Sequence, residues 1–261
     1  MHETMPSDSK DRPGKRSEPN VSDLQFRSHH RFVFILAALY FSLWTILAIA
    51  PVYRDDWALE NIVVLAGILV LVFTWSRYAF SRFSYFLMAL FLTLHAVGSH
   101  FTYSEVPYRE WLEYFFGETV QTTEKTDRNH YDRIVHFAYG LLLYYPFREC
   151  FLQFAKVRWK LWSHLVPLSF ILSTSLLYEL LEWAAAVVLG GDVGIEFLGS
   201  QGDIWDAQKD SFCAFIGAAI AMASIAIVFY ATKRDYPIEW IQFQKQHLEA
   251  RCNLRKSEQS L

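Results

Sequence analysis

Long apolar stretches alternate with short polar connections along most of the chain. Six stretches approach or exceed the roughly 20 residues that a helix needs to cross a bilayer. Runs such as 32–50 hold almost no polar residue on any helical face, which argues against a soluble helical bundle. We therefore predict an all-α, polytopic membrane protein with six transmembrane helices, at Phe32–Pro51, Ala58–Trp75, Phe83–Tyr103, Asp132–Phe147, Leu165–Leu189 and Asp206–Tyr230.

Polar segments flank this apolar region on both sides. Residues 1–30 are rich in Ser, Pro and charge and lack the apolar core of a signal peptide, so we predict a disordered N-terminal tail. Residues 31–231 form the transmembrane domain. Residues 232–261 form a C-terminal tail, in which scattered apolar residues such as Trp240 and Leu248 favour a helix lying on a surface.

The distribution of Lys and Arg predicts the orientation. The two tails with the second and fourth connections hold 18 basic residues, whereas the first, third and fifth connections hold 4. Because cytoplasmic loops of membrane proteins are enriched in Lys and Arg, we expect both termini to be cytoplasmic.

Composition agrees with the membrane class. The chain is 53% hydrophobic, with 22 Phe, 14 Tyr and 9 Trp. Its net charge of -3 gives no reason to expect a nucleic-acid partner. The three cysteines, Cys150, Cys213 and Cys252, lack metal-binding spacing, and we expect no disulfide framework.

Three aspartates lead into the last predicted span. If the segment is helical throughout, Asp203, Asp206 and Asp210 face the same way at spacings of three and four residues. Carboxylates on one stripe repel one another unless a cation or protons lie between them. The alternative is helix capping, which accounts for Asp203 and less well for Asp210, two turns in.

Two further groups carry charge into apolar segments. Glu179 and Glu182 lie within the fifth span, either as metal or proton ligands or as structural ion-pair partners of Arg133 or Lys209. Asp132 and His136 are four residues apart, a spacing that lets both bind one ion. Separately, they are also compatible with an N-cap and a packing histidine.

The predicted orientation places all these residues toward the outer membrane face. His95 and His100, which are weaker candidates, fall toward the outer end of the third span. Because groups found in separate segments share one depth, we predict a single polar site there.

The motifs around these residues resemble a known family. Asp132-Arg133-x-x-His136-Phe137, Tyr178-Glu179-x-x-Glu182-Trp183 and the run from Gly199 to Asp210 are similar to the YjdF family of bacterial inner-membrane proteins, whose function is unknown. The resemblance covers about 32–230 and implies a multi-pass protein of the bacterial inner membrane. A fainter similarity links the chain to VanZ-like membrane proteins, with Glu182 and Ala214 at positions where that pattern has Gln and Asn.

These observations favour a metal-dependent enzyme. Oxygen-rich clusters suit Mg²⁺, Mn²⁺ or Ca²⁺, and histidine adds Zn²⁺. Because the site lies at the depth of the lipid headgroups, we expect a lipid or lipid-linked envelope substrate. The metal ion would activate a water molecule or polarise a phosphoryl oxygen of that substrate. A proton- or cation-coupled transporter or binding protein and a structural role are the alternatives. We assign as metal ligands Asp132, His136, Glu179, Glu182, Asp206 and Asp210, and as catalytic groups Glu182, His136 and Asp203.

Overall fold

The fold is helical throughout the part of the chain that the computed structural model describes, residues 21–75, 77–117, 128–157, 161–191 and 199–259. Within those ranges there are eight α-helices, one short 3₁₀ turn and no strand. The helices are α1 (Val21–Leu47), α2 (Arg54–Thr74), α3 (Arg82–Phe101), α4 (Tyr108–Phe116), α5 (Tyr131–Gln153), α6 (Trp162–Leu189), α8 (Asp206–Thr232) and α9 (Tyr236–Gln259), with the turn η1 at Tyr103–Glu105.

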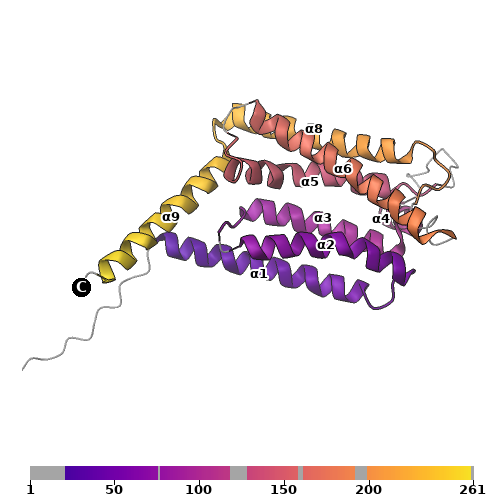
Figure 1. Cartoon of the computed structure of the whole chain (residues 1–261), viewed down its shortest axis with the longest axis horizontal. Helices are drawn as coiled ribbons and strands as arrows, with labels where there is room; N and C mark the ends of the chain where they lie inside the picture. Colours follow the sequence, from indigo (N-terminus) through magenta and orange to yellow (C-terminus); the bar gives the residue numbers. More distant parts are fainter. Residues whose placement is uncertain (1–20, 76, 118–127, 158–160, 192–198, 260–261) are drawn as a thin grey trace, which may run out of the picture.

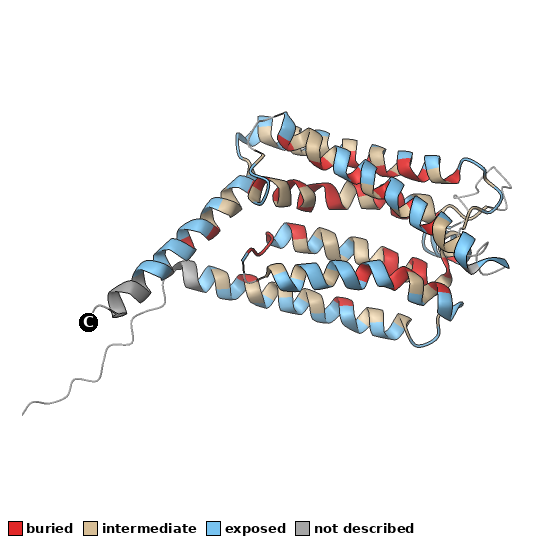
Figure 2. Ribbon diagram, in the orientation of Figure 1, coloured by how far each residue is buried: buried red, intermediate tan, exposed pale blue. Residues whose placement is uncertain are grey.

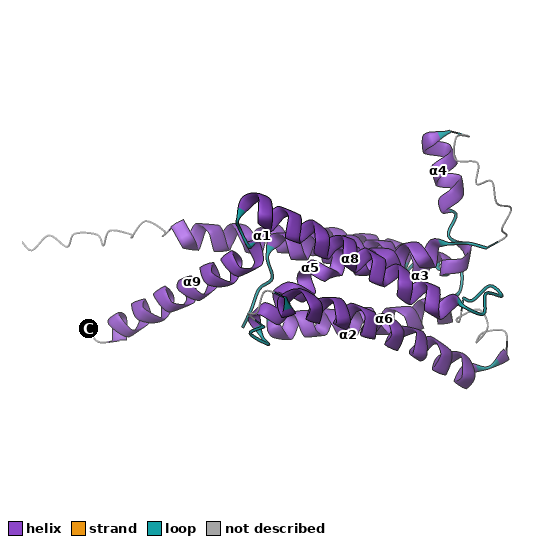
Figure 3. Cartoon of the chain, turned by 90° about the horizontal axis from the view of Figure 1, so that it is seen from above, coloured by secondary structure: helices purple, strands orange, loops and turns teal. Residues whose placement is uncertain are grey.

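The long helices form two layers (Figure 1). Helices α1, α2 and α3 make one layer, and α5, α6 and α8 make the other, with α3 packed against α5. Helix α9 leaves the bundle at the end where α1 begins. The short helix α4 lies at the opposite end and projects away from the bundle (Figure 3).

Five helices are long and apolar enough to cross a membrane, namely α1, α2, α3, α6 and α8. Many of their large apolar side chains are exposed, as lipid-facing surfaces require; Phe34, Phe73 and Val187 are examples. The protein is therefore a multi-pass membrane protein.

The fourth predicted span is a helix, α5, but it differs from the other five. It carries Asp132, Arg133, His136, Arg148 and Glu149, and its apolar character is too low for it to count as a span. It lies between α3, α6 and α8, and buried positions run along α5 and α8 (Figure 2). Because protein rather than lipid surrounds α5, its charges are compatible with the bundle. The count of six spans stays a prediction.

Helix α1 begins at Val21, so residues 21–30, assigned above to a tail, are helical; residues 1–20 lie outside the described residues. The first turns of α1 pack against α9. The ring of Phe26 stacks on His247 with centroids 4.0 Å apart, and His29 lies 4.7 Å from Trp240. Aromatic packing of this kind explains why the polar C-terminal segment forms a helix beside the bundle.

Two glycines bring α5 and α8 together. A Cβ atom on Gly140 would overlap the backbone of Ala214, and one on Gly217 would overlap the carbonyl group of Phe137. Small residues allow helix backbones in a membrane to approach closely, which increases their van der Waals contact. One turn after Gly140 on α5, Tyr144 packs with Ala218 and neighbouring residues in a buried core.

A buried carboxylate anchors the other end of α5. Glu149 is completely buried and accepts hydrogen bonds from the Ser81 amide and hydroxyl groups, both at 2.8 Å, and from the Ser84 hydroxyl at 2.5 Å. The Tyr78 hydroxyl also donates to it. Proximity to Glu149 and burial, the larger effect, both raise the pKa of Tyr78. These bonds fix α5 to the connection between α2 and α3.

Replacing Gly217 with alanine should strongly destabilise the bundle. The added methyl group meets backbone atoms that cannot rotate away, so the cost should be about 3 kcal/mol, at the upper end of what overpacking usually costs. Gly67→Ala is the matched control, because Gly67 is a helical glycine with nothing within 4 Å of an added Cβ. Unfolding by a denaturing detergent measures both variants, and equal stability of the two would contradict the proposed contact.

Candidate functional site

Three carboxylates from two helices meet at the end of the bundle near α4. One oxygen each from Asp132, Asp206 and Asp210 lie within 4.8 Å of one another. Asp132 is in the first turn of α5, and the other two lie four residues apart at the start of α8. The close crossing at Gly140 and Gly217 sets the register that brings these first turns together.

His136 connects this cluster to α6. Its Nε2 atom lies 3.5 Å from a carboxylate oxygen of Asp132 and 3.2 Å from one of Glu179. Its Nδ1 atom lies 3.2 Å from the Ser175 hydroxyl. Glu182 lies three residues after Glu179 on α6 and is also buried. The structure thus brings together all six residues that we predicted as metal ligands.

Two arginines lie against the aspartates. Arg128, just before α5, forms an ion pair with Asp206. Arg133 lies 3.6 Å from Asp206 and 3.7 Å from Asp210. Carboxylates that must stay ionised away from bulk water are commonly paired in this way.

The segment from Asp203 to Asp210 is not helical throughout, so the condition for a stripe shared by the three aspartates is not met. Helix α8 starts at Asp206, so Asp203 lies in the preceding turn rather than on a helical stripe with Asp206 and Asp210. Its carboxylate is 2.6 Å from both Arg133 and Lys209 and accepts the Trp205 amide hydrogen at 3.1 Å. Two hydrogen bonds hold the pKa of Asp203 well below its usual value. The bond from Lys209 has the larger effect, and the bond from the Trp205 amide has the next largest.

Asp210 stands out within the cluster. Its side chain is 1% exposed, and neither carboxylate oxygen accepts a hydrogen bond from any group in the described ranges. Leaving a buried carboxylate without hydrogen-bond donors is costly, because the group has lost its hydrogen bonds to water, and the more distant Arg133 replaces them only in part. Asp210 therefore has open coordination capacity at the centre of the site.

Sequence reasoning missed two members of this region. Glu60 of α2 is buried and accepts a hydrogen bond from the Tyr178 hydroxyl at 2.6 Å. Its carbonyl oxygen lies 3.3 Å from His95 Nε2, whose Nδ1 lies 2.5 Å from the Tyr103 hydroxyl. A charge inside the predicted second span was the available signal for Glu60. Arg128 gave no signal, because it lies in a polar connection.

The segments before α5 and α8 are joined at the same end. Asn129 and Gln201 exchange two hydrogen bonds between the side chain of Gln201 and the backbone of Asn129, at 2.8 and 3.0 Å. Arg128 also donates to the carbonyl group of Ser200. These bonds hold the polar turn before α8 against α5, and they explain why the motif around Gln201 belongs to the site.

The weaker candidate His100 lies apart from the cluster. His100 Nδ1 is 2.6 Å from the carbonyl oxygen of Leu47, a contact that joins α3 to the end of α1. We assign it a packing role.

The sequence matches a known family over most of its length. The family model described as "Predicted membrane protein (DUF2238)" matches residues 32–231. The chain belongs to this family. It is also 34% identical over 170 residues to the inner membrane protein YjdF of Escherichia coli strain K12, covering 65% of this chain and 77% of that relative. No solved structure matches the chain.

These matches confirm the predicted YjdF resemblance and the class of multi-pass inner-membrane protein. The names of the family and of this relative state no reaction or ligand, so function rests on the geometry of the site. The fainter VanZ-like similarity stays a prediction.

Arg133 and Lys209 should contribute very differently to stability. Arg133 contacts three carboxylates and its side chain is 21% exposed, whereas Lys209 is 48% exposed and contacts Asp203. Arg133→Met should cost roughly 3 kcal/mol because it removes the basic partner of the buried Asp210 and weakens the pairing of Asp203 and Asp206. Lys209→Met should cost at most about 1 kcal/mol. Denaturing-detergent titration gives both values, and similar losses would contradict a central role for Arg133.

Proposed function

We propose that the acidic cluster holds one divalent cation. The observation that carries this proposal is the meeting of three carboxylate oxygens within 4.8 Å, one of them from the buried and undonated Asp210. Calcium lies about 2.3–2.6 Å from its oxygen ligands, so oxygens on opposite sides of one ion are about 5 Å apart. Asp132, Asp206 and Asp210 therefore fit around a single ion with little movement.

The charge of the region supports a bound cation. Around the site lie the carboxylates Asp132, Glu179, Glu182, Asp203, Asp206 and Asp210, together with Glu60 of α2. The cations paired with them in the described ranges are Arg128, Arg133 and Lys209. Ion pairing alone leaves an excess of negative charge in a partly buried space. A metal ion or bound protons would remove that excess.

His136 and the two glutamates complete the proposed centre. His136 Nε2 lies near both Asp132 and Glu179, so it can join the metal ligands or remove a proton from a metal-bound water. Glu179 and Glu182 are further ligands or bases. Asp203 is already bonded to two cations, so we now assign it the positioning of Arg133 in place of a catalytic role.

The same geometry favours a phosphoryl group in the substrate. Arg128 and Arg133 lie beside the carboxylates, and guanidinium groups bind phosphate oxygens with two parallel hydrogen bonds. A divalent ion beside arginines can polarise a phosphoryl oxygen and lower the pKa of attacking water. We propose a metal-dependent enzyme acting on a lipid or lipid-linked envelope substrate. With both termini cytoplasmic, as the basic residues predict, this end faces the outer side.

Metal analysis of the purified protein tests the proposed centre. Prepared in mild detergent without chelator, the wild-type protein should hold roughly one Mg, Mn, Ca or Zn ion per chain, measured by elemental mass spectrometry. Asp206→Ala/Asp210→Ala should lose that ion, because two of the three central ligands are gone.

The control double variant is Asp55→Ala/Glu110→Ala, which removes two exposed acids and should retain the metal. No metal in wild type after incubation with each of the four ions would contradict the proposal. Loss from both double variants would show that the bound ion is not specific to the cluster.

One observation favours a second candidate, a proton- or cation-coupled transporter. Two hydrogen-bonded pairs of protonatable side chains extend the acidic site into α2 and α3, namely Tyr178–Glu60 and Tyr103–His95. However, α5 has no charged residue between His136 and Arg148, and α8 has none between Asp210 and Lys233. The charges therefore stop well short of the opposite end, which favours the enzyme.

Proteoliposomes separate these two candidates. Metal-loaded protein should release phosphate from a lipid-linked phosphate, and Asp210→Asn should abolish the release while the protein stays folded. Proton or cation flux across the same vesicles, lost in Asp210→Asn, would instead support transport.

A further inference from the structure

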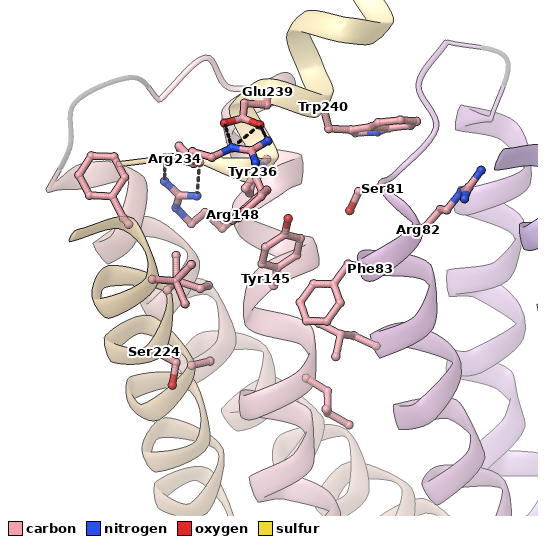
Figure 4. A pocket seen from close by; sticks show the side chains of 18 of the residues that line it. Ser81, Arg82, Phe83, Tyr145, Arg148, Ser224, Arg234, Tyr236, Glu239 and Trp240 are labelled. Carbon is pink, nitrogen blue, oxygen red and sulfur yellow. Dashed lines mark hydrogen bonds and ion pairs between the residues drawn. The ribbon is translucent and has the colours of Figure 1, made fainter. Parts of the chain in front are cut away.

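A second polar region lies at the opposite end of the bundle, beside a large cavity (Figure 4). The cavity has a volume of about 1000 Å³ and is partly open to the outside. Its walls come from α1, α3, α5, α8 and the first turns of α6 and α9. Pockets for organic ligands typically span about 300–1,000 Å³, so this one suits a large ligand. No residue proposed above as a metal ligand lines it.

The inner part of the cavity is apolar. Phe83 and Tyr145 both line it and pack edge to face on each other, with ring centroids 4.9 Å apart (Figure 4). Deeper in the bundle its walls include Leu87, Leu141 and Ile225. Leu141 lies seven residues, or about 10 Å of helix, before Arg148 at the rim. The shape is therefore an apolar slot that runs inward from a charged opening, as an acyl chain would require.

Basic groups surround the opening. Arg148 pairs with Asp235 through two hydrogen bonds of 2.9 and 2.6 Å, and Arg234 pairs with Glu239 (Figure 4). Arg82 lies 5.8 Å from the ring centre of Phe32 and forms no ion pair with a carboxylate of the described residues. The two acids are thus matched by two arginines, and Arg82 leaves the opening with a net positive charge.

A buried histidine adds an unfilled hydrogen-bonding position. His29 lines the cavity and is 1% exposed, and neither ring nitrogen has a hydrogen-bond partner within the described ranges. Its ring packs on Trp240, which fixes its position. A buried polar atom without a partner costs about 1–3 kcal/mol, so a ligand that supplies the partner is stabilised there.

We propose that this cavity binds one anionic phospholipid. Its acyl chain occupies the apolar slot, and its phosphate lies at the opening near Arg82 and His29. Charge complementarity carries the choice of ligand, because a net positive opening above an apolar slot matches a negative headgroup on a hydrocarbon chain. Basic pockets between transmembrane helices recognise anionic headgroups in this manner. The proposal is independent of the metal centre at the other end.

Native mass spectrometry of the full-length protein tests this site. Delipidated protein is incubated with phosphatidylglycerol, with phosphatidylethanolamine of the same acyl chains, or with inorganic phosphate. Wild type should bind one phosphatidylglycerol, with a dissociation constant about tenfold lower than that for phosphatidylethanolamine. Equal retention of the two lipids, or binding of phosphate alone, would overturn the proposal.

Two variants locate the binding. Arg82→Gln should reduce the preference for the anionic lipid, and Ser224→Phe should reduce retention of both lipids because a phenyl ring enters the slot. Ser173→Phe is the matched control: Ser173 and Ser224 are both exposed and both donate to the carbonyl oxygen four residues earlier at 2.8 Å. Wild-type retention in both Arg82→Gln and Ser224→Phe would overturn the site. Size-exclusion chromatography confirms folding, and Arg82→Gln alone decides if Ser224→Phe fails to fold.

Discussion

The close crossing of α5 and α8 is the constraint on which the rest of the structure depends. At Gly140 and Gly217 each helix presses against the backbone of the other. Two rods joined this tightly cannot slide past one another, so the depth of every residue on α5 is tied to that on α8. Asp132 lies about two turns and His136 about one turn before Gly140, and Asp210 lies about two turns before Gly217. The meeting of the acids at one end follows from this shared register.

The crossing also makes the polar character of α5 tolerable. Helices α3, α6 and α8 shield it, and its charged side chains lie near its two ends, with an uncharged stretch between His136 and Arg148. Each end uses a different solution for its charge. At Glu149 four donors saturate one carboxylate, whereas Asp210 keeps both oxygens undonated among the described residues. A saturated carboxylate holds the fold together, while an undonated one leaves room for a ligand.

Much of this architecture could be predicted from the sequence, because apolar length and in-span charge are local signals. The helices and the convergence of Asp132, His136, Glu179, Glu182, Asp206 and Asp210 followed from them. The ion pair of Asp203 with Arg133 did not, since it joins the turn before α8 to α5 across 70 positions of the sequence. Arg128 reaches Asp206 from a connection that carries no periodic pattern. The cavity was also unpredictable, because its walls come from six helices whose spacing is a property of the packed bundle.

The stacking of Phe26 on His247 has a consequence for how the molecule is made. The two residues lie more than 200 positions apart, and a ribosome adds about 5–20 residues per second. The first turns of α1 therefore wait roughly 10–40 s for α9 to emerge. During that interval Phe26 and His29 are without their aromatic partners on α9, while His29 already has Trp75 and Tyr85 beside it. The start of α1 is therefore held to the bundle by fewer contacts until α9 has docked.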